Sequence, residues 1–138
     1  MPTSRAVCAA AAASVLALSA GCATSSATQQ RPHLGSATAS AVGAVQQITV
    51  TTGNDYRFHP STITAHPGPL RVVLTNGTPS APHDLQVTGV TGAYVPLTQA
   101  GQTSQATFTV PGPGRYRFVC TIHIAQGQTG TLVVKAAS

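Results

Sequence analysis

The side chains best suited to bind a metal ion lie near the end of the 138-residue sequence. Cys120, His123 and Gln128 follow one another with the spacing Cys-x2-His-x4-Gln, and a further imidazole, His83, lies upstream in the segment Ala-Pro-His-Asp. Two imidazoles, one thiolate and a weak fourth ligand form the donor set of trigonal copper sites. The sequence therefore predicts a copper site, and the fold must bring residue 83 close to residues 120–128.

The first residues have the pattern of an export signal. Arg5 supplies a positive charge, and residues 6–18 form an apolar segment too short to span a membrane comfortably. The next segment, Leu-Ser-Ala-Gly-Cys, ends at Cys22 and resembles the bacterial lipobox, whose cysteine becomes the lipidated first residue of the mature protein. We therefore expect a lipoprotein-type signal peptide at residues 1–21. Lipid on Cys22 would then anchor the exported chain to the outer face of the cell membrane or in a periplasm. Ordinary secretion with an unmodified Cys22 is the alternative.

The cysteine count isolates Cys120. Of the three cysteines, Cys8 would leave with the signal peptide and Cys22 would carry the lipid. An unpaired thiol in an exported domain indicates a reactive group or a metal ligand, because it has no partner for a disulfide bond. Cys120 is therefore favoured as a metal ligand.

Composition divides the rest of the chain into two parts. Residues 22–45 consist largely of Ala, Ser, Thr, Gln and Gly without hydrophobic periodicity, so we expect a flexible linker there and a folded domain at 46–138. The formal net charge is +5, and the seven Lys and Arg residues are scattered along the chain. Nucleic-acid binding requires a clustered basic surface, so no nucleic-acid partner is expected.

Short strands are predicted throughout the folded domain. Val, Ile and Thr alternate with polar residues in segments separated by Gly, Pro and Asn. This pattern is typical of an all-β, antiparallel β-sandwich of the Greek-key type. The predicted strands are 47–51, 61–65, 70–76, 83–88, 105–110, 115–120 and 130–135. The segment 89–101 shows no clear pattern and is compatible with a turn or a short helix.

From about Asp55 to Lys135 the chain resembles the cupredoxins, and among them the plastocyanin-like group. The most specific motif is Cys-x2-His-x4-Gln-x-Gly at 120–130. Further matching segments are Phe-His-Pro at 58–60, Asn76, Pro-His-Asp at 82–84 and Gly-Pro-Gly-Arg-Tyr at 112–116. The resemblance implies a β-sandwich that binds one copper ion, with His83, Cys120 and His123 as the equatorial ligands.

The fourth ligand departs from the usual cupredoxin pattern. Most cupredoxins place a Met there, but Met1 is the only Met of this chain, and Gln128 stands at the corresponding position. Stellacyanin-like members use Gln, so the resemblance implies Gln128 as the axial ligand; Gln126 is a nearby alternative with the wrong spacing. An amide oxygen is harder than a thioether, and we therefore expect a lower reduction potential than that of a Met site.

The residues around the predicted ligands have expected roles as well. Asp84 stands where plastocyanins usually carry an Asn that ties the two ligand loops together, and Asp would add a negative charge near the metal. Val119 replaces a surface Tyr that plastocyanins use as a second electron route, so that route is not expected here. An apolar surface around the edge of His123 would suit brief docking with a redox partner; its expected members are Pro79, Pro82, Ile122, Ile124 and Ala125.

The leading functional hypothesis is a monomeric, membrane-tethered carrier of single electrons that meets a redox partner protein outside the cytoplasm. The alternative is a non-redox protein that buffers or delivers copper, although such proteins tend to use Met-rich or His-rich open sites. An oxidase or reductase ranks last, because one domain without further His clusters cannot assemble a multi-copper site. No enzymatic activity is therefore expected. A β-sandwich interaction module without a metal remains the simplest alternative.

Overall fold

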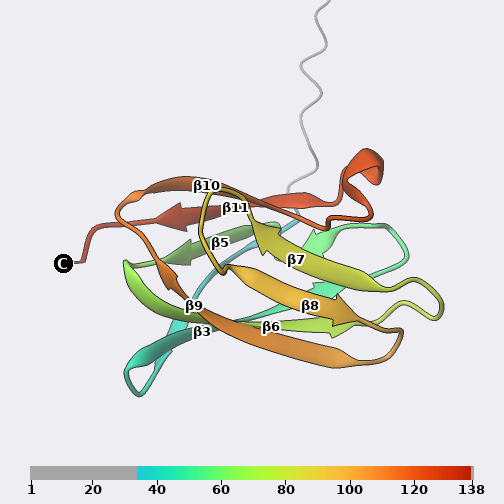
Figure 1. Cartoon of the computed structure of the whole chain (residues 1–138), viewed down its shortest axis with the longest axis horizontal. Coiled ribbons are helices and arrows are strands. Elements are labelled where there is room, and N and C mark those ends of the chain that lie inside the picture. Colours follow the sequence, from blue (N-terminus) through green and yellow to red (C-terminus); the bar gives the residue numbers. More distant parts are fainter. Residues whose placement is uncertain (1–33, 138) are drawn as a thin grey trace, which may run out of the picture. The chain divides into compact units, whose positions relative to one another are not determined.

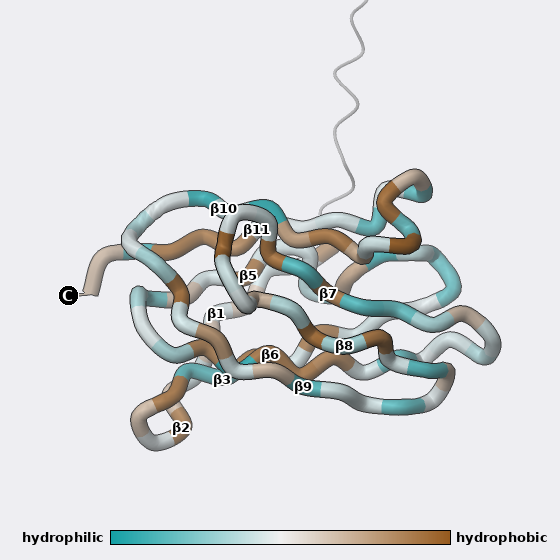
Figure 2. The backbone as a smooth tube through the Cα atoms, in the orientation of Figure 1, coloured by the Kyte–Doolittle hydropathy of each residue, from teal (hydrophilic) through white to brown (hydrophobic). Residues whose placement is uncertain are grey.

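The strands form two facing β-sheets, and buried and exposed side chains alternate along many of them (Figure 1). The computed structural model describes residues 34–137. In the 5-stranded sheet, strand β6 (Gly68–Asn76) buries every second side chain, and it appears as a hydrophobic segment in Figure 2. Strand β6 pairs in parallel with β3 (Val45–Thr52) and antiparallel with β9 (Thr103–Val110). The short strands β2 (Ser40–Val42) and β4 (Phe58–His59) both pair with β3.

The 6-stranded sheet positions the predicted ligands. Its strands follow the order β1-β5-β11-β10-β7-β8. Strand β10 (Gly114–Val119) pairs antiparallel with both β11 (Thr129–Val134) and β7 (His83–Val87). Because β7 and β10 are antiparallel neighbours, the start of β7 and the end of β10 lie at the same end of the sheet. The remaining strands are β8 (Tyr94–Thr98), β5 (Thr62–Ala65) and β1 (Ser36–Thr38).

A continuous apolar core fills the space between the sheets. Phe58 and Phe118 are fully buried and their ring centroids lie 5.2 Å apart, so β4 and β10 meet across the sandwich. Burial of such large side chains removes apolar surface from water and is the main stabilising contribution in a sandwich of this size. Other members of the core are Ile63, Leu70, Val72, Leu74, Leu85, Val95, Leu132 and Val134.

The all-β sandwich predicted from the sequence is confirmed, with one difference in strand direction. Three strand pairs are parallel, namely β1 with β5, β5 with β11, and β3 with β6, so both sheets are mixed rather than purely antiparallel. Parallel pairing arises here because the connections cross from one sheet to the other, as β5 to β6 does, instead of forming hairpins within one sheet.

The predicted boundary of the folded domain at residue 46 is wrong. Strands β1 and β2 lie within the segment that was expected to be a flexible linker, and they pair with β5 and β3. Apart from the exposed Val42, their side chains are Ser, Thr and Ala, which give no clear apolar pattern, and pairing with existing sheet edges supplies the order. The predicted signal peptide and Cys22 lie outside the described residues.

Two further local structures were not predicted. The segment 89–101 contains strand β8 at the edge of the 6-stranded sheet rather than a helix. The connection between β10 and β11 contains the short 3-10 helix η1 (Ile124–Gln126), which is seen as a coil at the right-hand end of Figure 1. Within residues 34–137, no helix has the length and hydrophobicity needed to cross a bilayer.

Candidate metal centre

Three donor atoms, one from strand β7 and two from the connection after β10, converge at one end of the sandwich. His83 is the first residue of β7, Cys120 directly follows the end of β10, and His123 lies one turn later, before η1. The Nδ1 atoms of His83 and His123 lie 3.2 Å apart. The Cys120 Sγ lies 3.5 Å from His123 Nδ1 and 4.0 Å from His83 Nδ1. The structure thus brings together the three residues that the sequence singled out as equatorial ligands.

The fourth predicted ligand reaches the same point. Gln128 is fully buried, and its Oε1 lies 2.8 Å from His83 Nδ1. The backbone explains how it gets there, because Gly127 adopts the left-handed conformation (φ 82°) and turns the chain from η1 back toward β11. The carbonyl of Gln128 also accepts a hydrogen bond from the Cys120 N–H at 3.0 Å. Gln126, the alternative, lies in η1 with an exposed side chain.

Asp84 ties the two ligand-bearing segments together. It is buried, and its carboxylate accepts hydrogen bonds from the Thr121 N–H at 2.6 Å and from the Thr121 hydroxyl at 2.5 Å. Because Asp84 follows His83 and Thr121 follows Cys120, these bonds fix the two ligands relative to each other. The Tyr94 hydroxyl, on edge strand β8, donates a further hydrogen bond to Asp84 at 3.3 Å. The predicted tie is therefore present, with a carboxylate as its acceptor.

A comparison with protein-family models identifies the chain. Residues 11–134 match the model of the cupredoxin-like domain, which covers most of the sequence. The chain belongs to the cupredoxin-like family. Comparison with curated protein sequences gave no significant match.

Several solved structures share this fold. Auracyanin from Roseiflexus castenholzii, reduced with dithionite, is 21% identical, with a TM-score of 0.60 over 67% of this chain and 99% of its own. Auracyanin A, a "blue" copper protein from Chloroflexus aurantiacus, is 19% identical, with a TM-score of 0.57 over 73% of this chain and 100% of its own. The Cu(I)-bound metal-binding domain of a Cu(I)-exporting P-type ATPase from Streptococcus pneumoniae is 21% identical, with a TM-score of 0.62 over 74% of this chain and 97% of its own. At these identities the likeness shows the fold alone.

The donor cluster of this cupredoxin fits one copper ion. In residues 34–137, His83, Cys120 and His123 form a group of side chains that could hold a metal ion, with ligand atoms within 4.8 Å of one another. The centre of the triangle formed by these three atoms lies roughly 2.1 Å from each, close to the bond lengths of nitrogen and sulfur to a first-row metal. Two imidazoles and one thiol with an amide oxygen nearby match a cupredoxin copper site in element and number.

Burial sets the protonation state of these donors. Burial lowers the pKa of His83, although its hydrogen bond to Gln128 opposes the shift. Burial also raises the pKa of the Cys120 thiol. Without metal at neutral pH, His83 is therefore neutral and Cys120 is protonated. Copper binding must release the thiol proton, and we expect it to weaken in acid.

Only one of the four side chains reaches the surface. His83, Cys120 and Gln128 are each 0% exposed, whereas His123 is half-buried. On either side of His123, Ile122 and Ile124 are 50% and 46% exposed. Two members of the predicted apolar surface, the chain neighbours of His123, are therefore exposed. Val119, which was expected to replace a surface Tyr, is buried at 6% exposure.

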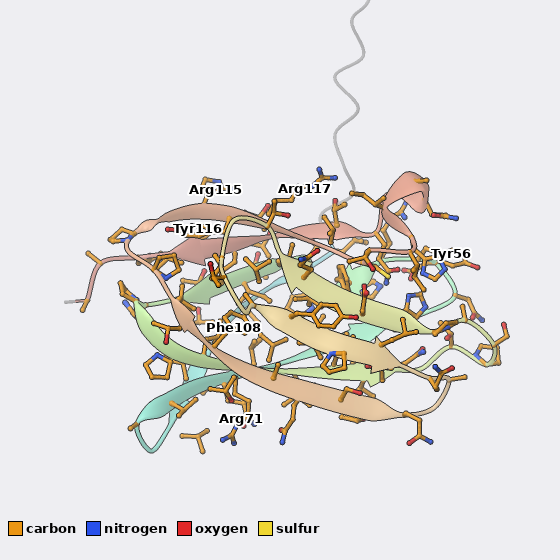
Figure 3. All side chains as sticks on the ribbon, viewed as in Figure 1. Tyr56, Arg71, Phe108, Arg115, Tyr116 and Arg117 are labelled. Carbon is orange, nitrogen blue, oxygen red and sulfur yellow. The ribbon has the colours of Figure 1, made fainter. Side chains whose placement is uncertain are left out.

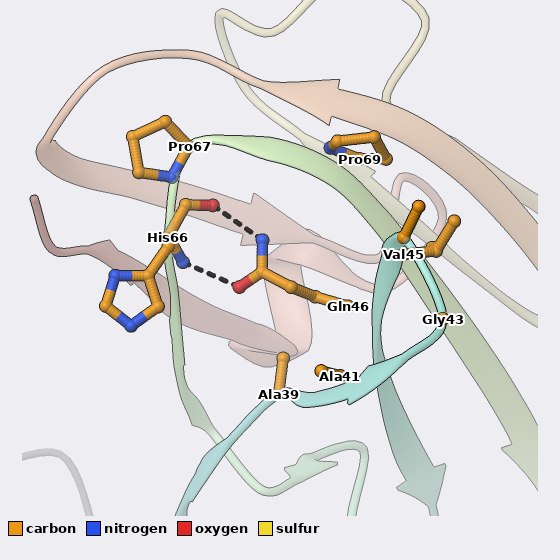
Figure 4. A pocket seen from close by; sticks show the side chains of 9 residues that line it. Ala39, Ala41, Gly43, Val45, Gln46, His66, Pro67 and Pro69 are labelled. Carbon is orange, nitrogen blue, oxygen red and sulfur yellow. Dashed lines mark hydrogen bonds between the residues drawn. The ribbon is translucent and has the colours of Figure 1, made fainter. Parts of the chain in front are cut away.

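The two other described histidines lie away from the donor cluster. His59 Nε2 lies 2.8 Å from Asp55 Oδ2 in a partly exposed pair. His66 lines a pocket of about 340 Å³ beside the turn between β2 and β3 (Figure 4). The Gln46 side chain binds the backbone N–H and C=O of His66 there, both at 2.8 Å. These contacts give His59 and His66 local structural roles.

Sequence reasoning missed two residues at the donor cluster. The ring of Tyr56 packs against both imidazoles. Arg57 donates a hydrogen bond to the carbonyl of Gln126, between the two ligands on the β10–β11 connection. No periodicity or spacing predicts these contacts, because they join segments that are distant in the sequence. The positive φ of Tyr56 is likewise seen only in the structure.

Proposed function

We propose that this cupredoxin is a carrier of single electrons that holds one copper ion with His83, Cys120, His123 and, at the axial position, Gln128. The observation that carries the proposal is the unequal exposure of the donors: three are fully buried, and the ring of His123 alone meets the surface. An ion enclosed in this way has no open position for a substrate, while the accessible ring offers an electron a short route to a partner.

The chemistry of the donors agrees with this role. When bound, copper supplies a couple that accepts or releases one electron. The Cys120 thiolate favours the softer Cu(I), and the imidazoles of His83 and His123 tolerate both oxidation states. The hydrogen bonds of Asp84 and the Cys120 N–H hold the ligand segments in place, so a change of charge needs little movement of the protein.

The surface around His123 supports a protein partner. Ile122 and Ile124 form a small exposed apolar patch at the ring edge, which suits a brief contact that buries little area. We infer a redox protein as the partner of a monomeric carrier. No nucleic-acid partner is proposed, because the described basic residues are dispersed over both sheets.

We further infer that the chain is exported and tethered by lipid at Cys22. Because β1 begins at Ser36, about 13 residues would separate the lipid from the folded domain, and an extended chain of that length reaches at most about 45 Å. This tether is therefore shorter than the linker over residues 22–45 that the sequence predicts. Mass spectrometry of the mature N-terminus tests this inference: diacylated Cys22 is expected, and an unmodified Cys22 would contradict it.

Delivery of copper is the alternative function. It is favoured by the likeness of the fold to the Cu(I)-bound domain of the copper exporter. The buried donors argue against ready release of the ion. The distinguishing experiment is repeated reduction and oxidation of the copper-loaded protein in the presence of a Cu(I) chelator. A carrier gives a reversible one-electron wave and keeps its copper, whereas a delivery protein loses copper to the chelator in the first reduced phase.

A further inference from the structure

Tyr56 has an unusual backbone conformation for its residue type. Among residues 34–137 it is the only non-glycine residue with positive φ, at 52°. A side chain disfavours this left-handed region, and such outliers persist only where the surrounding structure holds them. They are found most often at functional sites.

Hydrogen bonds on the β3–β4 connection hold Tyr56 in this conformation. Its N–H donates to the carbonyl of Gly53 at 3.2 Å. One carboxylate oxygen of Asp55 accepts a hydrogen bond from the Arg57 N–H at 3.1 Å, and the other lies 2.8 Å from His59 Nε2. The exposed carboxylate of Asp55, the residue before Tyr56, is therefore linked to two residues that follow Tyr56.

The turn places the Tyr56 ring against the two histidines of the donor cluster. Its centroid lies 4.8 Å from that of His123 and 6.0 Å from that of His83, and all three rings are tilted relative to one another. Figure 3 shows Tyr56 at the same end of the sandwich as the β10–β11 connection. Tyr56 thus packs directly against the half-buried ring of His123.

The next residue connects the turn to the other half of the site. One Arg57 nitrogen, Nη1, donates to the carbonyl of Tyr56 at 2.8 Å and to the carbonyl of Gln126 at 2.7 Å. Gln126 is the last residue of η1, whose terminal carbonyls have no partner inside so short a helix. Because Gln128 follows two residues later, this bond fixes the start of the turn that carries the fourth donor.

We propose that Tyr56 and Arg57 are positioning residues of the copper site: Tyr56 holds the ring of His123, and Arg57 holds the segment that presents Gln128. The inference rests on the proposed function, because a preorganised site matters most for a carrier whose ligands must stay in place while the charge changes. It also explains the unfavourable backbone conformation of Tyr56, which places the ring against His123.

The first test uses the metal-free full-length chain and hydrogen exchange. In Tyr56→Gly the backbone keeps its favoured φ while the ring is lost, and Arg57→Ala removes the link to Gln126. Both variants should raise the exchange rate of the Gln128 amide, which donates to the His123 carbonyl at 3.2 Å, by at least about tenfold. Amides of β6 should exchange at the unchanged rate. Equal Gln128 rates in all proteins, or a uniform rise that includes β6, would overturn the proposal.

Two matched variants provide the controls. Tyr56→Phe keeps the ring and should behave as the unmodified chain does. Arg71→Ala also removes an arginine with two side-chain hydrogen bonds. Arg71 lies on β6 of the 5-stranded sheet, whereas β7, β10 and β11 next to the ligands belong to the 6-stranded sheet (Figure 3). This substitution should therefore leave the Gln128 amide unaffected. If Gln128 exchange rises in either control as much as in the test variants, Tyr56 and Arg57 have no specific positioning role.

The second test uses the copper-loaded chain. Tyr56→Gly and Arg57→Ala should release copper to a chelator at least tenfold faster and change the visible spectrum, while Tyr56→Phe should do neither. Release rates and spectra that match the unmodified chain would reject the inference but leave the carrier function intact. Failure of the unmodified chain to bind copper would reject the proposed function, and the hydrogen-exchange comparison would still decide the inference.

Discussion

The side-chain oxygen of Gln128 lies 2.8 Å from Nδ1 of His83, although 45 residues separate them in the chain. Both side chains are fully buried, so this contact is made inside the sandwich and not at its surface. It places an amide oxygen beside the three atoms that form the candidate copper site. In the proposed copper site this oxygen would take the place of the Met sulfur of most cupredoxins, and it is a harder donor.

Gln128→Met should raise the reduction potential. A thioether stabilises Cu(I) relative to an amide oxygen, and we expect a rise of at least about 59 mV, the one-electron equivalent of a tenfold change in relative affinity. Protein-film voltammetry measures the shift. Gln126→Met is the matched control, because its side chain is exposed in η1, and it should leave the potential unchanged. If Gln128→Met and the unmodified protein have the same potential, Gln128 is not an axial ligand of the copper.

Asp84→Asn should also raise the potential. The substitution removes a buried negative charge that follows His83, and a charge near the metal stabilises Cu(II) over Cu(I). We expect a rise on the order of 50 mV, which is about 1 kcal/mol for one electron. Tyr94→Phe removes the hydroxyl that donates to Asp84, and it should shift the potential slightly downward. Shifts in the same direction for both variants would argue against an electrostatic origin.

The strands that position the donors could be predicted from the sequence because apolar residues alternate clearly along them. Leu70, Val72 and Leu74 identify β6, and the segment that ends at Cys120 identifies β10. The ligand residues could be predicted because their spacing is local, apart from His83, for which the family resemblance supplied the link. The resulting fold and cluster agree with the structure.

The missed features depend on tertiary contacts. Strands β1 and β2 contain small residues whose order comes from the edges of β5 and β3. Strand β8 includes Pro96, which is accepted at a sheet edge but obscures a strand pattern. The contacts of Tyr56 and Arg57 join the β3–β4 turn to η1, and neither local segment indicates the other.

Gly130→Ala should destabilise the protein strongly. Gly130 lies in β11, and a methyl group there would overlap the ring of Phe118 and approach the Ser61 carbonyl to 2.6 Å. Overpacking of this kind costs about 1–3 kcal/mol of the free energy of unfolding, which urea denaturation measures. Gly112→Ala is the control, because nothing lies within 4 Å of its added methyl group. A loss in Gly130→Ala no larger than that in Gly112→Ala would contradict the packing described for β10 and β11.

The metal-free protein should lose stability as the pH falls below about 6.5, the usual pKa of an exposed histidine. Burial lowers the pKa of folded His83, so between the two pKa values the unfolded chain binds the proton more readily than the folded chain. The free energy of unfolding therefore decreases toward acid by up to about 1.4 kcal/mol per pH unit for this group. Urea midpoints between pH 7.5 and 5 measure the effect, and His83→Gln should reduce the slope. An identical slope in the variant would contradict a buried, neutral His83.

Optical titration of the purified chain with Cu(II) tests most directly whether Cys120, His83 and His123 bind one copper ion together. We predict an intense visible absorption from charge transfer between thiolate and copper that saturates at one equivalent. Cys120→Ser should lack this band while keeping the same far-ultraviolet circular dichroism. Absence of the band from the unmodified chain, or its persistence in Cys120→Ser, would contradict the account.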